Sequence, residues 1–265
     1  MSATLRIERH GSFTRVTLAR PEVRNAFNAE LIEALRSAFD ALAAEPPESL
    51  RGVVLAGDGP TFSAGADVEW MRAAIGLGVE ENERDASAMQ AMFAAIDACP
   101  VPVIARVHGA ALGGGMGLCA VSDIVVASAD TTFGFTETRL GIIPAVISTY
   151  VLPTIGESHA RALFATGQRF DADRAQRIGL VHEVVADAAA LDASVEALLD
   201  GLRAAGPTAI RAAKELVRTI QTLGPEEARA RTPGLIAAQR TSPEGQEGLT
   251  AFLEKRQPRW RDDRG

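Results

Sequence analysis

The chain has 265 residues, of which 47% are hydrophobic, and it carries a formal net charge of −7. This length and apolar content suffice for a large buried core, and the acidic balance argues against a general nucleic-acid binder. No apolar run is long enough to cross a bilayer, and residues 1–10 lack the apolar segment of a signal peptide, so we expect a cytoplasmic protein.

The first half of the chain alternates between strand-like and helix-like patterns. Asn28 has the residue type of a helix N-cap and precedes apolar residues at helical spacing. In chain order the patterns predict strands at 5–7 and 13–18 around a turn, a helix between Asn28 and Pro46, a strand at 53–55, helices at 70–78 and 86–98, and a strand at 101–107. Met89 and Met92, on one face of the helix at 86–98, are expected to fill the core.

The second half changes character after Val185. Strand and helix alternate up to that residue, which predicts an α/β core. No strand-like run follows, and we expect helices at 191–202, 207–223, 225–240 and from 248 onward, with Pro233–Gly234 interrupting the third. An all-helical C-terminal extension of this kind usually packs on something, and partner subunits are a reasonable expectation.

A run of three glycines, Gly113 to Gly115, follows the strand at 101–107 and opens a short apolar helix. Glycines allow a tight turn and close approach of a ligand, and the free N–H groups of the helix start can bind an oxygen. A phosphate loop is excluded because no Lys-Ser or Lys-Thr pair follows. The dinucleotide-binding pattern fails because its last glycine would be Leu118, and close helix–strand packing remains an alternative.

A second loop, Thr61 to Asp67, has a similar composition and also follows a buried strand. Its end residue, Asp67, is of the N-cap type. A serine hydrolase is excluded because Ser63 is not within a G-x-S-x-G motif. Two such loops could hold one oxygen between their backbone N–H groups, although a plain strand-to-helix connection would look the same.

Glu137 stands among aromatic and apolar residues in the segment 133–144. A carboxyl group in an apolar pocket has its charged form disfavoured, which suits acid/base chemistry near neutral pH. The alternative is an exposed glutamate paired with Arg139. Cys99 and Cys119 stand in apolar surroundings and are expected to be buried thiols, and the four histidines show no metal-ligand spacing.

Taken together, these motifs resemble the enoyl-CoA hydratase/isomerase (crotonase) family over nearly the whole chain. The residues that carry the resemblance are Arg20–Pro21 with Arg24 to Asn28, Phe62 to Asp67, Pro100 to Ala105, the triple glycine, Ser122 to Ile124, Thr136 to Pro144, Ala172 to His182, and Phe252 to Arg256. The resemblance implies an α/β fold built as a spiral of β-β-α units, here residues 1–190, with a helical oligomerisation region at 191–265. It also implies trimers or hexamers, and no cofactor, because coenzyme A is part of the substrate.

The resemblance implies roles for individual residues. The N–H groups of Ala66 and Gly114 would hold the thioester oxygen of an acyl-CoA, and Glu137 would act as the general acid/base. Further positions implied in substrate and coenzyme A binding are Arg24, Ala26, Ala64, Asp67, Val68, Gly113 and Gly117, with Phe252 and Lys255 reaching the site of a neighbouring subunit.

The chain departs from the family pattern at Gly117. Well-characterised hydratases of the family have a second catalytic glutamate there, and the segment 145–150 replaces their usual glycine-rich run. This combination is similar to bacterial 3-methylglutaconyl-CoA and isohexenylglutaconyl-CoA hydratases of leucine and acyclic terpene breakdown. We therefore expect hydration of a branched, carboxylated 2-enoyl-CoA, with free volume at Gly117 for the acyl group and with Arg72 or Arg139 as a partner for its carboxylate. A Δ3,Δ2-enoyl-CoA isomerase that uses Glu137 alone, or a non-catalytic acyl-CoA or RNA-binding protein, are the alternatives.

Overall fold

A computed structural model describes residues 4–261 and contains two β-sheets. The larger sheet has six strands, in the order β1 (Leu5–His10), β2 (Phe13–Leu18), β3 (Gly52–Gly57), β4 (Val103–Val107), β6 (Ile124–Ser128) and β9 (Glu183–Val185). The β1–β2 pair is antiparallel and the remaining pairs are parallel. The smaller sheet has the order β5 (Ala110–Leu112), β7 (Thr132–Gly134) and β8 (Arg169–Asp171). The predicted α/β fold and its strands are therefore confirmed.

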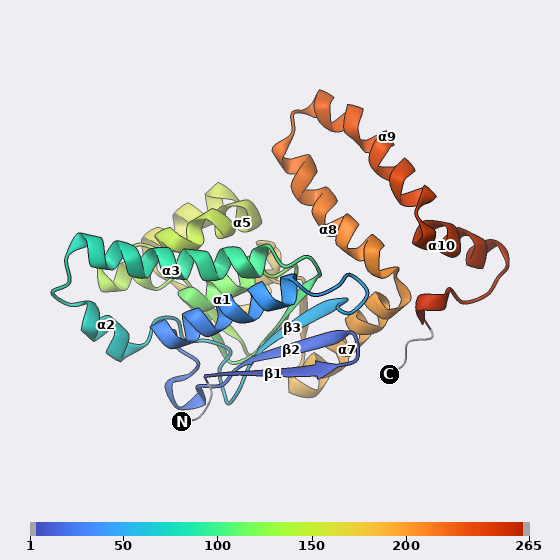
Figure 1. Cartoon of the computed structure of the whole chain (residues 1–265). Coiled ribbons are helices and arrows are strands. Elements are labelled where there is room, and N and C mark those ends of the chain that lie inside the picture. Colours follow the sequence, from blue (N-terminus) through green and yellow to red (C-terminus); the bar gives the residue numbers. More distant parts are fainter. Residues whose placement is uncertain (1–3, 262–265) are drawn as a thin grey trace.

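Helices cover both faces of the large sheet, because successive side chains of a strand point to opposite faces. On one face, Ile104 and Val126 pack against Leu191 and Val195 of α7 (Ala188–Ala204). On the other face lies the main core, which α1 (Ala29–Ala43) and α3 (Val79–Asp97) enclose; Figure 1 shows both crossing the sheet on the side opposite α7. The remaining core elements are α2 (Val68–Ala74), α4 (Gly114–Val121), α5 (Ala145–Thr166), α6 (Ala172–Arg177) and the 3-10 turns η1 (Pro21–Val23) and η2 (Glu137–Leu140).

Three details of the predicted helices differ from the structure. Helix α2 ends at Ala74, before Gly76 with its positive φ of 87°, rather than at residue 78. Helix α3 begins at Val79 instead of residue 86, because the Glu81 carboxylate accepts a hydrogen bond from the N–H of Gly78 and so caps a first turn that has no apolar pattern. Of the two methionines expected in the core, Met92 is fully buried, whereas Met89 is only partly buried.

The expected interruption at Pro233 is wrong. Helix α9 (Pro225–Thr241) runs through this proline without a break. A proline removes the N–H that would bond the carbonyl four residues earlier, which here belongs to Arg229. The hydroxyl of Thr232 donates a hydrogen bond of 3.2 Å to that carbonyl, so the bond lost to the proline is replaced locally.

Beyond the core, α8 (Pro207–Thr222) and α9 form a pair of helices that extends away from the sheet, followed by α10 (Pro243–Leu253) and η3 (Arg259–Arg261) (Figure 1). Polar residues attach α8 to the core. The ammonium group of Lys214 donates to the Asp123 carboxylate at 2.6 Å and to the Val101 carbonyl at 3.1 Å. The apolar residues Leu216 and Val217 are instead exposed.

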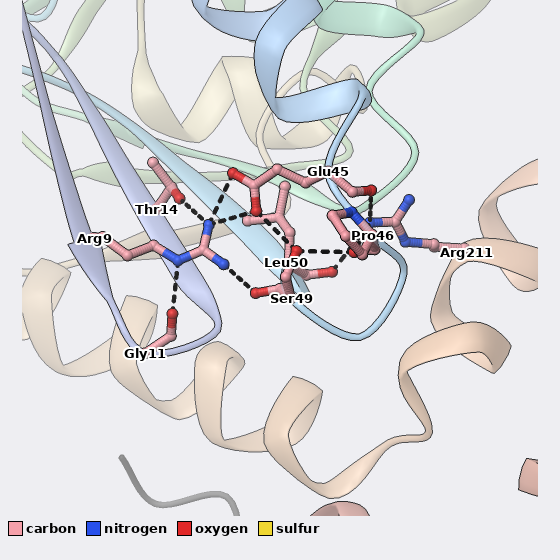
Figure 2. Close-up of polar contacts among 8 residues, drawn as sticks. All are labelled: Arg9, Gly11, Thr14, Glu45, Pro46, Ser49, Leu50 and Arg211. Atoms are coloured by element: carbon pink, nitrogen blue, oxygen red, sulfur yellow. Dashed lines mark hydrogen bonds and ion pairs between the residues drawn. The ribbon is translucent and has the colours of Figure 1, made fainter.

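A second attachment of α8 involves the turn after α1. Arg211 donates to backbone carbonyls of Glu45, Pro46 and Leu50 from one side of this turn, and Arg9 binds it from the other (Figure 2). Arg9 donates to the Glu45 carboxylate at 2.9 Å and also to the Ser49 carbonyl, and so joins β1 to the same turn. The two guanidinium groups thus fix the first residues of α8 relative to the sheet. Within residues 4–261, no helix has the length and apolar character needed to cross a membrane.

We expect Lys214→Met to destabilise the attachment of α8. Asp123 keeps its bond from the N–H of Val103 but loses its charged partner, and a hydrogen bond to a charged group typically contributes about 1.5–3 kcal/mol. Chemical denaturation would measure the loss, and hydrogen exchange would locate it in residues 207–222. Arg161→Met is the control, since its ion pair with Glu157 is exposed and long at 3.8 Å. Equal stability of both variants would contradict this role of Lys214.

Candidate active site

A cavity of about 390 Å³ lies where the two predicted loops, η2 and the helices α2, α3 and α5 meet. Its wall is mostly apolar and includes Phe27, Trp70, Met71 and Met89. Among residues 4–261, the carboxylates in the lining are Asp85 and Glu137, and no lysine or arginine lines the cavity. An adjoining hollow shares Met71, Ala74, Asn82, Leu140 and Ile142 with the cavity and adds Arg72.

The two loops contact each other backbone to backbone. Ser63 forms a parallel bridge with Ala111, in which the N–H of Ser63 donates to the Ala110 carbonyl at 3.1 Å and the N–H of Leu112 donates to the Ser63 carbonyl at 3.0 Å. Glycines permit this approach. A Cβ at Gly65 would lie 2.9 Å from the Leu112 carbonyl oxygen, and a Cβ at Gly115 would lie 2.8 Å from the Ser63 carbonyl oxygen. The loop compositions therefore follow from the contact that the loops make.

Two backbone N–H groups remain free beside this contact. Phe27 bridges Ala66 by donating to the Gly65 carbonyl at 2.6 Å and accepting from the N–H of Asp67 at 2.9 Å, so the N–H of Ala66 is directed away from Phe27. Gly114 is the first residue of α4, where N–H groups have no intrahelical acceptor. Across residues 4–261 neither N–H has a hydrogen-bond acceptor, and both residues line the cavity. The pair is suited to bind one oxygen atom.

Asn25 fixes the first of these loops. It is fully buried, and its side-chain amide donates to the carbonyls of Asp58 at 2.8 Å and Thr61 at 2.7 Å, while its oxygen accepts from the N–H of Arg20 at 2.9 Å. Arg20 in turn pairs with Asp67 at 2.8 Å. Burial favours a higher pKa for Asp67, but the bonds from Arg20 and from the N–H of Glu69 outweigh it and hold the pKa below its ordinary value. The Asp67 carboxylate thus has a structural role, because its hydrogen bonds hold the loop and the start of α2.

The carboxyl group of Glu137 lies in the same cavity as the two free N–H groups. Its Oε1 lies 3.5 Å from the position that a Cβ on Gly113 would occupy. Its Oε2 is buried and has no hydrogen-bond partner, and burial raises the pKa of this carboxyl above its ordinary value. The predicted alternative, a pair with Arg139, is wrong: no ion pair joins them in the described part of the chain, and the Arg139 side chain packs against Gly167. An unpartnered carboxyl with a raised pKa is suited to transfer protons near neutral pH.

The expected free volume at Gly117 is not present. A Cβ at this position would lie 2.5 Å from Ile147 Cγ2 and 2.6 Å from the ring of Phe93. Gly117 is itself buried and does not border the cavity, whereas Ile147 does. The prediction of open space is therefore corrected, because two large apolar side chains fill the position that an acid would need.

The other predicted site residues divide into three groups. Ala64 and Gly113 line the cavity together with Ala66, Gly114 and Glu137, and Val68 lines the adjoining hollow, whereas Asp67 and Gly117 do not border the cavity. Arg24 and Ala26 lie beside the first loop, where the Arg24 carbonyl accepts from the N–H of Ala64. Phe252 and Lys255, at the end of α10, do not line the cavity of their own chain, and Phe252 is 81% exposed.

Sequence reasoning missed most of the apolar wall, including Phe27, Trp70, Met71, Met89 and Ile147. Of these, only Met89 carried a usable signal, because its position on α3 was recognised but assigned to the core. No group of histidine, cysteine or acidic side chains suited to a metal ion occurs in residues 4–261.

Comparisons with known proteins identify the family. The sequence profile of the enoyl-CoA hydratase/isomerase family matches residues 8–263. The structure of Pseudomonas aeruginosa AtuE aligns with a TM-score of 0.93 at 37% identity, covering 98% of this chain and 100% of that one. An enoyl-CoA hydratase structure from Shewanella pealeana aligns with a TM-score of 0.91 at 34% identity, covering 97% and 96%. The 2,3-dehydroadipyl-CoA hydratase of Escherichia coli is 32% identical over 92% of each chain. The predicted crotonase fold is thereby confirmed, and the family is one of enzymes.

We expect Glu137→Gln to raise the stability of the folded protein at neutral pH. A carboxyl whose pKa is raised by folding binds its proton more tightly in the folded state, so stability falls as pH rises from the ordinary pKa, about 4.3, through the raised value. The neutral amide removes this cost. Thermal unfolding at a series of pH values should show a higher Tm than wild type at pH 7 and a difference that shrinks toward pH 4. The exposed Glu157→Gln serves as control, and a pH-independent difference for Glu137→Gln would contradict the assignment.

Proposed function

We propose that this chain, which belongs to the enoyl-CoA hydratase/isomerase family, adds water to the double bond of a 2-enoyl-CoA. One observation carries the proposal: the unpartnered carboxyl of Glu137 borders the same cavity as the free N–H groups of Ala66 and Gly114. A proton-transfer group beside an oxyanion-binding pair is the arrangement that chemistry next to a thioester carbonyl needs.

In the proposed reaction the thioester oxygen accepts hydrogen bonds from Ala66 and Gly114. Glu137 takes a proton from water while the hydroxyl oxygen bonds to C3, and the electrons of the double bond move to the thioester oxygen as an enolate. A proton then passes from Glu137 to C2, which returns the carboxylate to its starting form. Each N–H donor to the enolate is worth about 3–4 kcal/mol of the barrier, and the raised pKa of Glu137 suits both proton steps.

A second candidate is a Δ3,Δ2-enoyl-CoA isomerase. The supporting observation is that position 117 carries no carboxyl and is closed by Phe93 and Ile147. Moving a proton between two carbons needs one carboxylate and no water. Both reactions place negative charge on the thioester oxygen, a 3-hydroxy enolate in hydration and a dienolate in isomerisation, so the same N–H pair would serve either one. The isotope content of the product separates them.

We further propose a branched acyl group with a distal carboxylate, of the 3-methylglutaconyl type. The Escherichia coli relative is named for a dicarboxylic acyl-CoA, which supports a carboxylated substrate. The cavity lining has no cation, so a distal carboxylate would pair with Arg72 in the adjoining hollow. Arg72 is exposed and pairs only with the neighbouring Glu69 among the described residues, so it is accessible to a ligand.

We also propose a trimer, or a hexamer of two trimers. The support is the apolar surface of the C-terminal helices, including Leu235, Ile236 and Leu249, which a single chain leaves exposed. In such an assembly Phe252 and Lys255 would reach the coenzyme A site of a neighbour. The acyl-CoA substrate itself supplies coenzyme A, and the proposed reaction needs no further cofactor.

We expect Glu137→Gln to retain coenzyme A thioester binding and to lose turnover by at least a hundredfold, in keeping with loss of a general acid/base. The assay is incubation with 2-enoyl-CoA and 3-enoyl-CoA in heavy-oxygen water: heavy oxygen in the product indicates hydration, and double-bond migration without it indicates isomerisation. Glu157→Gln, on the surface of α5, is the matched control. Near wild-type turnover by Glu137→Gln would overturn the role of Glu137.

We expect Arg72→Ala to lower kcat/KM about tenfold for a carboxylated 2-enoyl-CoA, because a charge-assisted bond is lost, and to leave an uncharged substrate of equal length nearly unaffected. Arg139→Ala is the matched control, because that side chain packs against Gly167. Equal effects on both substrates would show that Arg72 does not bind a carboxylate.

A further inference from the structure

The closed position at Gly117 is separated from the candidate active-site cavity by Ile147, which borders both. Gly117 follows Gly114 by three residues on α4, and so lies almost one turn, about 4.5 Å, along the helix from the N–H proposed to bind the thioester oxygen. The C2 and C3 atoms of an acyl group are the next atoms along the chain from that oxygen's carbon. Of the two side chains that cover Gly117, Ile147 also lines the cavity that contains Ala66, Gly114 and Glu137, so it can contact the acyl group in the proposed reaction.

Two buried side chains cover Gly117, and contacts within the core hold them in place. Ile147, on α5, is 2% exposed and lines the cavity, and Phe93, on α3, is fully buried behind it. The Phe93 ring packs against Phe27 and Tyr150, with ring centroids 6.3 Å and 6.1 Å away. The Tyr150 hydroxyl accepts a hydrogen bond of 3.0 Å from Gln90, which ties α5 to α3 behind the rings. The cover is a fixed part of the core.

We infer that Ile147, supported by Phe93, is a specificity-determining residue that replaces the second acid by an apolar wall beside C3. The wall favours an acyl group that bears a small apolar branch at this carbon and leaves Glu137 as the group that handles water. This inference rests on the proposed hydration of a 2-enoyl-CoA. It differs from the sequence-based expectation, in which the missing side chain at 117 made room for the branch.

Positions 117 and 147 are consequently coupled. Any side chain at 117 collides with Ile147 and Phe93, so an acid there would need a smaller residue at 147. A carboxylate in that position would also be buried among apolar groups, which is costly without a partner. The side chain at 147 thus determines which residues fit at 117, although 30 residues of sequence separate the two positions.

The coupling can be tested on the protein without substrate. We expect Gly117→Ala to lower Tm by several degrees, because added volume in a packed core is destabilising. The same substitution made in an Ile147→Ala background should lower Tm by less, when Gly117→Ala/Ile147→Ala is compared with Ile147→Ala alone. The matched control replaces Ile155, a buried isoleucine of the same helix, in Gly117→Ala/Ile155→Ala. Additive losses in the control and a non-additive recovery with Ile147 support the coupling. A Gly117→Ala variant as stable as wild type, or equal recovery with Ile155→Ala, would overturn it.

Substrate selection is tested with three 2-enoyl-CoAs that have a distal carboxylate and carry hydrogen, methyl or propyl as the branch at C3. We expect wild type to prefer methyl over both others, and Ile147→Ala to raise the propyl-to-methyl ratio of kcat/KM about tenfold, the usual effect of one or two methylenes in an apolar pocket. Ile155→Ala should keep the wild-type ratio. If wild type hydrates the panel but the Ile147→Ala ratio does not change, the wall is not the determinant. If wild type hydrates no member, the proposed function fails instead, while the stability test still decides the coupling.

Discussion

The close contact between two backbone loops is the constraint on which the site depends. Parallel pairing of β3 and β4 places the carboxyl ends of these strands side by side, so the chain leaves both strands at the same edge of the sheet. The loops then pair through Ser63 and Ala111, at a separation that only glycine at 65 and 115 allows. Because this backbone is held from both sides, the N–H groups of Ala66 and Gly114 are presented to the cavity before any ligand arrives, and such preorganised donors are the effective ones.

Much of this arrangement could be predicted from the sequence, because its causes are local. Asn28 caps α1 as its residue type indicates, accepting from the N–H of Leu31, and Asp67 caps α2. The clustered glycines marked the two loops that contact each other. The spacing of apolar residues did not predict helix bounds that depend on polar atoms. The first turn of α3 has no apolar spacing, so its start was missed. In α9, the Thr232 hydroxyl replaces the hydrogen bond lost at Pro233, and residue type does not specify such a bond.

The chemistry of the site was less predictable, because it depends on what distant segments place nearby. Whether Glu137 is paired or isolated turns on the direction of Arg139, which packs against Gly167 at the end of α5. The absence of a side chain at Gly117 was visible, but the filling of that space by Phe93 and Ile147 was not, because α3 and α5 reach it from separate parts of the chain. A glycine in a sequence shows that a side chain is missing, and only the packing around it shows whether space remains.

Helix α8 departs from the usual arrangement of an amphipathic helix, because charged as well as apolar residues face the core. Arg211 and Lys214 of α8 face the core, where they bond backbone carbonyls and Asp123, while Leu216 and Val217 face outward. Arg211 Nη2 and Lys214 Nζ have specific acceptors, so these charged groups orient the helix. The outward apolar residues continue onto α10, where Phe252 and Leu253 are exposed. Burial of these residues requires another surface, and in the proposed trimer a second copy of the chain supplies it. The residues that would complete a neighbour's coenzyme A site are among those exposed, so assembly and substrate binding would then be favoured by the same contacts.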